Sequence, residues 1–364
     1  MRKCNIDILA CPLCLNSLQL EIYNQNEIEI IDGMLQCSNC KAKYLIKEKI
    51  ARMIPNDTLK YSEDFTLIKK INEKHQKIRD ANIIYHDIAA NTYDEDEAVS
   101  VFQNKFNQER IEKIIKDLSR RDGNDNLFFL DIGCGTGNVL KFGKKYFQYA
   151  IGMDVSLNML KLTNTRGMEV IQADALFLPF KASTFDTVSI FSVLHHIYDY
   201  SSIFMQIGRV LKKGGFLYSD WDPQKRPLIN INKKESIGKL YYLLFFLYHS
   251  VSFLKNKFAK NTNKINKPLN LRENMPEIKE VYKLAEFHEQ KPMYERGIDL
   301  EIMKKGLIDN GFIDIQPTFH WGGKLFNQLD LIQQVRLYLL SKYSGFPKER
   351  LMENIQVIAC KREQ

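Results

Sequence analysis

The sequence predicts an α/β protein in which a small cysteine-rich unit precedes a sheet of parallel strands. Three observations carry this prediction: two Cys-x-x-Cys pairs near the N-terminus, a glycine-free helical stretch, and then apolar strands alternating with helices. Continuous apolar strands separated by helices are typical of a parallel sheet that is covered on both faces. A chain of 364 residues, 45% of them hydrophobic, is long enough for two units with a sizeable core.

The cysteine-rich unit is predicted to be a zinc ribbon spanning residues 1–57. Cys11 and Cys14 form one pair, and Cys37 and Cys40 form the other. Two thiolates on a tight turn can face one ion, and a hairpin between the pairs brings all four together. Four thiolates leave no open position, so the expected zinc is structural and stabilises a module too small for its own core.

The remaining cysteines and the net charge say little about the cellular location or the partners of the protein. Cys4, Cys134 and Cys360 are expected to be ordinary thiols. No apolar leader precedes the first cysteine pair, so we expect a cytoplasmic protein whose cysteines bind metal or stay reduced. The formal net charge of +8, from 52 basic and 44 acidic residues, permits an anionic partner such as RNA or a membrane surface without requiring one.

Alternating strands and helices follow the predicted N-terminal helical segment, residues 58–123. The predicted core, residues 124–364, has its strands at 127–133, 150–156, 169–174, 185–197, 214–223, 311–321 and 354–363, and a helix at 203–213. In open α/β sheets, ligands bind beyond the carboxyl ends of the strands.

Polar residues stand where three of these strands end. The first strand runs into the glycine-rich segment from Asp131 to Gly137, where missing Cβ atoms let a ligand lie on the backbone. Asp154 ends the second strand and can accept from ribose hydroxyls, and Asp174 with Ala175 ends the third, where a carboxylate can accept from an adenine amino group. Three such positions in register describe a nucleoside site.

Residues 130–223 resemble the methyltransferase domain of the ubiquinone/menaquinone-biosynthesis type. The motifs DIGCGTGNVL, GMDVSLNML, QADALFLPF, FDTVSIFSVLHHI and VLKKGG occur in the order and spacing of that family. The resemblance implies a Rossmann-like seven-stranded sheet and S-adenosylmethionine as methyl donor. It implies that the donor is bound by Asp131, Gly133, Gly135, Gly137, Asp154, Asp174, Ala175 and Ser192, with Tyr85 and Tyr93 closing over it. The tyrosines also fit an ordinary helix face.

The N-terminal unit resembles the small zinc-ribbon proteins that bind and activate methyltransferases. LACPLC, CSNC and the following KYLIKEKIARMIP carry this resemblance. The last segment departs from the usual pattern, because Leu45 and Lys49 stand where proline and glycine are usual. The four ligands are intact, whereas the docking surface is altered.

Catalytic residues remain open, because a base is needed only if the acceptor must lose a proton. His195, His196 and Asp222 are candidates near the end of the fourth and fifth strands, although the histidines also fit a structural cap. The fourth strand ends in FSVLHH and lacks the Asn/Asp-Pro-Pro-aromatic motif of many amino-group methyltransferases. Methylation of an exocyclic amine is therefore disfavoured.

An insertion of about residues 224–296 is expected to cap the acceptor pocket. It contains the apolar run 240–254, which is too short to span a membrane and is followed by a basic stretch. We expect a lid whose apolar face lies near His195 and Trp221; residues 240–272 also fit a peripheral membrane contact.

Three functions are compatible with the sequence. The first is methyl transfer to a small-molecule or lipid-like acceptor. The second is methylation of rRNA or tRNA with the ribbon gripping the nucleic acid, and the third is a non-catalytic protein that binds S-adenosylmethionine. The sequence does not indicate the oligomeric state.

Overall fold

The structure is a computed structural model, and it describes most of the chain in six ranges. These are residues 1–55, 73–95, 103–120, 127–225, 297–320 and 354–362, with a few isolated positions between them. The predicted insertion, including the run 240–254 and the basic stretch to 272, lies outside the described residues. None of the described helices is long and apolar enough to cross a membrane.

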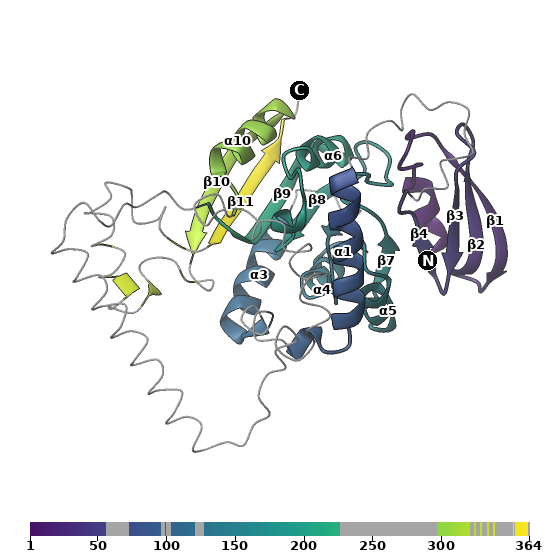
Figure 1. The fold of residues 1–364 in the computed structure, drawn as a ribbon, viewed down its shortest axis with the longest axis horizontal. Helices are drawn as coiled ribbons and strands as arrows, with labels where there is room; N and C mark the ends of the chain where they lie inside the picture. Colours follow the sequence, from purple (N-terminus) through teal and green to yellow (C-terminus); the bar gives the residue numbers. More distant parts are fainter. Residues whose placement is uncertain are drawn as a thin grey trace, which may run out of the picture.

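Seven strands form the predicted sheet, in the order β7-β6-β5-β8-β9-β11-β10. The first five of these pair in parallel, and β11 is antiparallel to both β9 and β10 (Figure 1). Their bounds are β5 Phe128–Ile132, β6 Tyr149–Asp154, β7 Glu169–Gln172, β8 Phe185–Phe191, β9 Leu211–Pro223, β10 Phe312–His320 and β11 Asn354–Lys361. The predicted α/β fold class is confirmed.

Helices cover this sheet on both faces. α3 (Lys105–Leu118), α4 (Leu140–Tyr146) and α5 (Leu157–Thr165) pack in one apolar cluster, and α6 (Ile203–Val210) and α10 (Leu300–Asp309) pack in another. Neighbouring residues of β5 divide between the clusters, since Phe129 belongs to the first and Leu130 to the second. This is the alternation expected of a strand buried on both sides.

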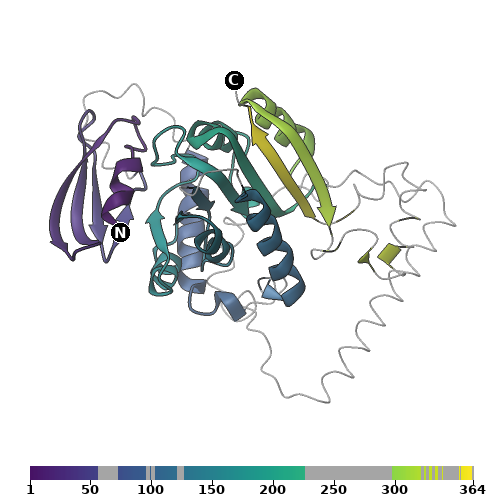
Figure 2. The same cartoon turned by 180° about the vertical axis from the view of Figure 1, so that it is seen from behind.

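The segment before the first core strand is helical, as predicted. α1 (Glu73–Ala89) lies over the sheet, in front of it in Figure 1 and behind it in Figure 2, and the short η3 (Tyr93–Glu95) follows it. Asp87 fastens α1 to the start of α5, because its carboxylate accepts from Ser156 Oγ at 2.6 Å and from the Asn158 amide at 2.9 Å. The helix is thereby held above the carboxyl ends of the strands.

Two strands differ from the sequence prediction. β8 ends at Phe191, and Leu194–His196 form the short 3-10 helix η4 where we expected the strand to continue. Ser192 has a φ of 58°, a left-handed conformation that cannot continue an extended strand. β9 begins at Leu211, so the last three residues of the helix predicted at 203–213 belong to this strand instead.

The ribbon adds four strands to the sheet, so the whole sheet has eleven strands rather than seven. β1 (Leu18–Gln25), β2 (Ile30–Cys37), β3 (Lys43–Lys47) and β4 (Ile50–Arg52) form an antiparallel meander. β4 then pairs in parallel with β7. An edge strand exposes unpaired backbone groups, and this pairing satisfies those of β7.

Further contacts make the ribbon continuous with the core. The amide of Ala10 donates to the Pro179 carbonyl at 3.0 Å, and the amide of Met53 donates to the Gln172 carbonyl at 2.7 Å. Asn5 donates through its side chain to Glu169 at 3.1 Å. Apolar residues of the ribbon, such as Leu9, share one buried cluster with residues of the core. The ribbon is therefore packed as part of the sheet.

We expect loss of the ribbon's metal site to destabilise the core as well as the ribbon. Cys37→Ser should lower the thermal midpoint of the whole protein by about 10 °C, because a structural zinc site contributes folding free energy directly. Cys4→Ser is the matched control, since Cys4 is exposed and is not one of the four clustered cysteines. Differential scanning calorimetry decides: a separate early transition that leaves the main midpoint unchanged would contradict the shared core.

Candidate functional site

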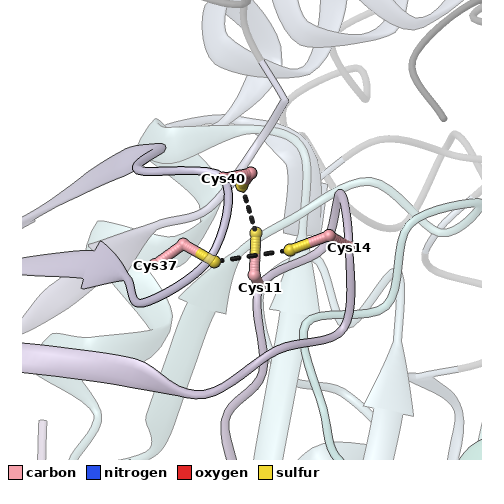
Figure 3. A group of neighbouring side chains, drawn as sticks. All are labelled: Cys11, Cys14, Cys37 and Cys40. Atoms are coloured by element: carbon pink, nitrogen blue, oxygen red, sulfur yellow. Dashed lines mark hydrogen bonds between the residues drawn. The ribbon is translucent and has the colours of Figure 1, made fainter. Parts of the chain in front are cut away.

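The four paired cysteines converge on one point between the two ribbon turns. Figure 3 shows their side chains directed at one another. All four sulfur atoms lie within 4.8 Å of one another, with 3.6 Å between Cys11 and Cys40 and 3.3 Å between Cys14 and Cys37. Tetrahedral zinc with Zn–S bonds of about 2.3 Å places its sulfurs about 3.8 Å apart, so the cluster fits this ion.

Burial makes ionisation of the Cys11 thiol costly when no cation is bound. Burial raises the pKa of the Cys11 thiol to about 11, despite a 3.1 Å contact with the Tyr44 hydroxyl. A thiolate at this position therefore needs a compensating positive charge, which a zinc ion supplies. No fifth position is open to a substrate in a four-thiolate site, so its contribution is to folding.

A cavity lies beyond the carboxyl ends of β5, β6, β7 and β8, beneath α1. Its walls include the glycine-rich turn, the ends of β6 to β8, and one face of α1. The residues that line it include His75, Arg79, His86, Tyr93, Gly133, Gly135, Asp154, Asp174, Ala175, Phe191, Ser192 and His196. The structure therefore brings seven of the ten sequence-predicted donor-binding residues to one cavity.

Gly135 forms an open cradle in the cavity wall. Its φ is +50°, and a Cβ at this position would meet only Tyr93, at 4.0 Å. A side chain here would thus occupy the cavity itself, which is the arrangement needed where a ligand lies on the backbone. Gly133 is required for a different reason, since a Cβ there would come within 2.3 Å of Val193.

Asp154 connects the glycine turn with the end of β6. One carboxylate oxygen accepts from the Gly135 amide and the other from the Ser156 amide, both at 2.9 Å. Each oxygen keeps a second lone pair that can accept from a ligand hydroxyl. Burial raises the pKa of Asp154. Ligand hydroxyl groups that donate to this carboxylate would favour its ionised form.

Two basic residues of α1 meet the carboxylate of Asp174. His75 Nε2 lies 2.8 Å from Asp174 Oδ2, and Arg79 Nη1 lies 3.7 Å from the same oxygen. The other oxygen accepts from the Leu176 amide at 2.9 Å. Neither basic residue was predicted from the sequence; their i, i+4 spacing along α1 is the signal that could have indicated a shared face.

Asp94 fastens η3 to the glycine turn. Its carboxylate accepts from Thr136 Oγ1 at 2.6 Å and from Arg166 Nη2 at 2.8 Å. Arg166 also donates to the Thr136 carbonyl at 2.7 Å. Although burial opposes ionisation, these donors lower the pKa of Asp94. The sequence analysis also missed this clamp, which holds the neighbouring Tyr93 against the cavity.

Histidines surround the opposite end of the cavity from Asp174. His86 of α1 and His196 of η4 both line it, and their ring centroids are 5.5 Å apart. His195 lies behind them: its Nδ1 is 2.7 Å from Asp222 Oδ1, and its ring centroid is 4.0 Å from that of His196. His195 and Asp222 are both buried. His86 is a further residue that the sequence analysis did not single out.

A buried network holds the end of β9. The Asp220 carboxylate accepts from Tyr218 Oη at 2.6 Å and the Trp221 amide at 2.7 Å, and it lies 2.8 Å from both Arg110 Nη1 and His320 Nε2. Trp221 has a φ of 66°, and its ring stacks on Phe191 at 5.7 Å. The four partners of the Asp220 carboxylate stabilise the strained backbone at Trp221. They also lower the pKa of Asp220, although burial opposes its ionisation.

Three predicted donor-binding residues do not line the cavity. Asp131 is buried beneath the turn, where Ser189 Oγ donates to it at 2.6 Å and burial raises its pKa to about 7. Gly137 packs against Met168, and Tyr85 packs edge-on against His86 at 5.1 Å. These residues support the cavity wall from behind.

Comparisons with known proteins agree with this arrangement. Residues 130–219 match the family model described as methyltransferase domain, and residues 6–48 match the model described as Trm112p-like protein. The chain carries a methyltransferase domain fused to a Trm112p-like ribbon. The fusion predicted from the sequence motifs is therefore confirmed.

Individual relatives share only part of the chain. An uncharacterized protein of Methanocaldococcus jannaschii is 35% identical over 36% of this chain and 47% of its own length. A demethylmenaquinone methyltransferase of Lactococcus lactis is 28% identical over 46% of this chain and 68% of its own length. A tRNA (carboxymethyluridine(34)-5-O)-methyltransferase of Arabidopsis thaliana is 35% identical over 24% of this chain and 22% of its own length. The chain thus spans about half the length of the archaeal relative.

Asp94→Asn tests the clamp on the glycine turn. Because the pKa of Asp94 is lowered in the fold, its ionised form stabilises the protein above the unfolded pKa of about 4 and this contribution is lost at lower pH. The variant should be less stable than wild type near pH 7, and the difference should shrink as the pH falls below about 4. Urea unfolding at several pH values measures this.

Asp309→Asn serves as the control for that measurement, because Asp309 makes an exposed i, i+4 pair with Lys305. An Asp94→Asn protein whose stability follows the wild-type pH curve in parallel would exclude a charged clamp.

Proposed function

We propose that the protein transfers a methyl group from S-adenosylmethionine to a small-molecule or lipid-like acceptor. The observation that carries the proposal is the single cavity lined by the glycine turn, Asp154 and Asp174, within a methyltransferase domain. Asp154 would accept from the ribose hydroxyls, and the Asp174–Ala175 end would hold the adenine. Gly133 and Gly135 would lie under the methionine part, and Ser192 near the sulfonium.

The position of the ribbon supports a small acceptor over a grip on nucleic acid. Its last strand is paired with β7, and its apolar residues are buried in the shared core. These contacts give the ribbon a role in stabilising the fold, so binding of nucleic acid is not needed to explain its presence. Support also comes from the Lactococcus lactis relative, whose name specifies demethylmenaquinone as acceptor.

RNA is the second candidate acceptor. The observations in its favour are the Trm112p-like match, the net charge of +8, and the tRNA-methyltransferase relative from Arabidopsis thaliana. The outer strand β1 remains largely exposed and is available to a large partner. A catalytic role for His195, His196 or Asp222 is compatible with either class of acceptor.

Asp154→Asn should weaken binding of S-adenosylmethionine. The Asn side chain has only one acceptor oxygen, for which the ribose hydroxyls and the Gly135 amide would compete. Each charge-assisted hydrogen bond that is lost costs about 1.5–3 kcal/mol. Isothermal titration calorimetry measures the affinity.

Asp186→Asn is the matched control for Asp154→Asn. Asp186 is also a buried strand aspartate that accepts from a backbone amide, that of Phe128, but it lies at the start of β8 rather than at the cavity. Equal affinities for wild type and Asp154→Asn would mean that the ribose lies elsewhere.

Transfer of a labelled methyl group into fractionated cell extract identifies the acceptor class. We expect label in the small-molecule or lipid fraction with wild type and none with Gly135→Leu, whose side chain would fill the cavity. Label in RNA would instead establish the second candidate. Donor binding without label in any fraction would favour the non-catalytic alternative.

A further inference from the structure

The methionine end of the donor cavity is bordered by two imidazoles from separate elements. His86 comes from the last turn of α1, and His196 comes from η4, four residues after Ser192. Their rings meet edge to face at an interplanar angle of 86°, and His86 also meets Tyr93 with a centroid distance of 5.8 Å. Two basic nitrogen heterocycles thus face the region where donor and acceptor have to meet.

A histidine–aspartate pair lies directly behind this imidazole pair. Asp222 Oδ1 accepts from the backbone amide of His195 at 3.1 Å and lies 2.7 Å from its ring Nδ1. A carboxylate is an acceptor, so the proton of neutral His195 belongs on Nδ1 and its basic lone pair on Nε2. The His195 ring then contacts the His196 ring, and Asp222 contributes negative charge to the group.

The charged and titratable groups around His196 differ from those around His86. Burial, together with the nearby imidazoles of His196 and His195, lowers the pKa of His86 to about 3. His196, in contrast, is attracted to the Asp154 carboxylate at the end of β6, and it lies beside the His195–Asp222 pair from η4 and β9. The aromatic group facing the pair from η3 is Tyr93, which is close to His86.

We propose that His196 accepts the proton that the acceptor loses on methylation, with His86 as its neutral partner. The acceptor is then a nucleophile that bears this proton at the reacting atom, a hydroxyl group or a carbon acid. This inference rests on the proposed methyl transfer and narrows its substrate class. Amines reached through an Asn/Asp-Pro-Pro motif are already disfavoured by the FSVLHH sequence at this strand end.

The step balances without a further reactant. The nucleophilic atom forms a bond to the methyl carbon, and the bond from that carbon to sulfur breaks with its electron pair going to sulfur. The proton of the nucleophile moves to an imidazole nitrogen of His196. Asp222 and His195 are positioning residues, because they act by orienting His196 and by balancing the charge it gains.

The first test needs no acceptor, because donor and product differ in charge at sulfur. S-adenosylmethionine carries a sulfonium and S-adenosylhomocysteine a neutral thioether. Protonated His196 should repel only the sulfonium, so in wild type the affinity ratio of donor to product should fall several-fold from about pH 8 to about pH 5.5, because like charges within one cavity repel each other. In His196→Gln the ratio should stay constant over this range.

His75→Gln is the matched control for this titration. It removes an imidazole from the same cavity but at the Asp174 end, so it should weaken donor and product equally and keep the wild-type pH dependence. An unchanged pH dependence in His196→Gln would overturn the proposal. Failure of wild type to bind either compound at any pH is a different result, and it would retire the proposed function as well.

The second test follows transfer into the extract fraction that accepts label. At about pH 8, where His196 is expected to be neutral in the proposal, His196→Gln should lower the transfer rate about 100-fold or more at unchanged donor affinity, the usual contribution of a positioned base. His86→Gln and Asp222→Asn should give smaller losses, with the acidic limb of the pH profile shifted in Asp222→Asn. If the transfer rate of His196→Gln is within threefold of the wild-type rate and the acidic limb of its pH profile is unchanged, no proton passes to His196.

Discussion

The parallel pairing of β4 with β7 is the constraint on which the rest of the structure depends. β7 would otherwise be the edge of the seven-stranded sheet, and its carboxyl end leads into Asp174, which lines the cavity. The ribbon satisfies that edge with backbone hydrogen bonds and covers it with apolar side chains. The position of Asp174 therefore depends on a strand whose own meander is held by the four-cysteine cluster.

This dependence links the metal site with the donor site through ordinary packing. A ribbon of about fifty residues buries too little apolar surface to fold alone, and a structural metal is the usual remedy. Joining the ribbon to a larger core distributes that stabilisation over one sheet of eleven strands. Fusion in one chain also removes the translational entropy that a separate subunit would lose on docking.

The sequence predicted the parts that follow from local pattern. Strand periodicity located the core strands, and the glycines with Asp154 and Asp174 placed the cavity at the strand ends, where the structure has them. The spacing of Cys11, Cys14, Cys37 and Cys40 likewise predicted one cluster. Each of these signals lies within a short segment whose geometry is set by turns and strand ends.

The parts that could not be predicted depend on how distant segments dock. His75, Arg79 and His86 share one face of α1, but their spacing alone does not say that this face covers the cavity rather than solvent. The role of Asp94 requires η3 to lie on the glycine turn, which is set by Arg166 from the end of α5. The strand predicted at 185–197 ends at Phe191 in the structure, because the left-handed backbone at Ser192 has no signature in an apolar run.

The charge distribution in the cavity fits a cationic donor and a neutral product. Carboxylates at the ends of β6 and β7, Asp154 and Asp174, contribute negative charge, and the positive charge of Arg79 is directed at Asp174, away from the methionine end. The basic groups at the methionine end are the imidazoles of His86 and His196, and burial keeps His86 neutral. Neutral imidazoles do not repel a sulfonium, whereas lysine or arginine at these positions would. In the proposed transfer, the positive charge is lost from sulfur and a proton is gained by His196, so the total charge of the site is conserved.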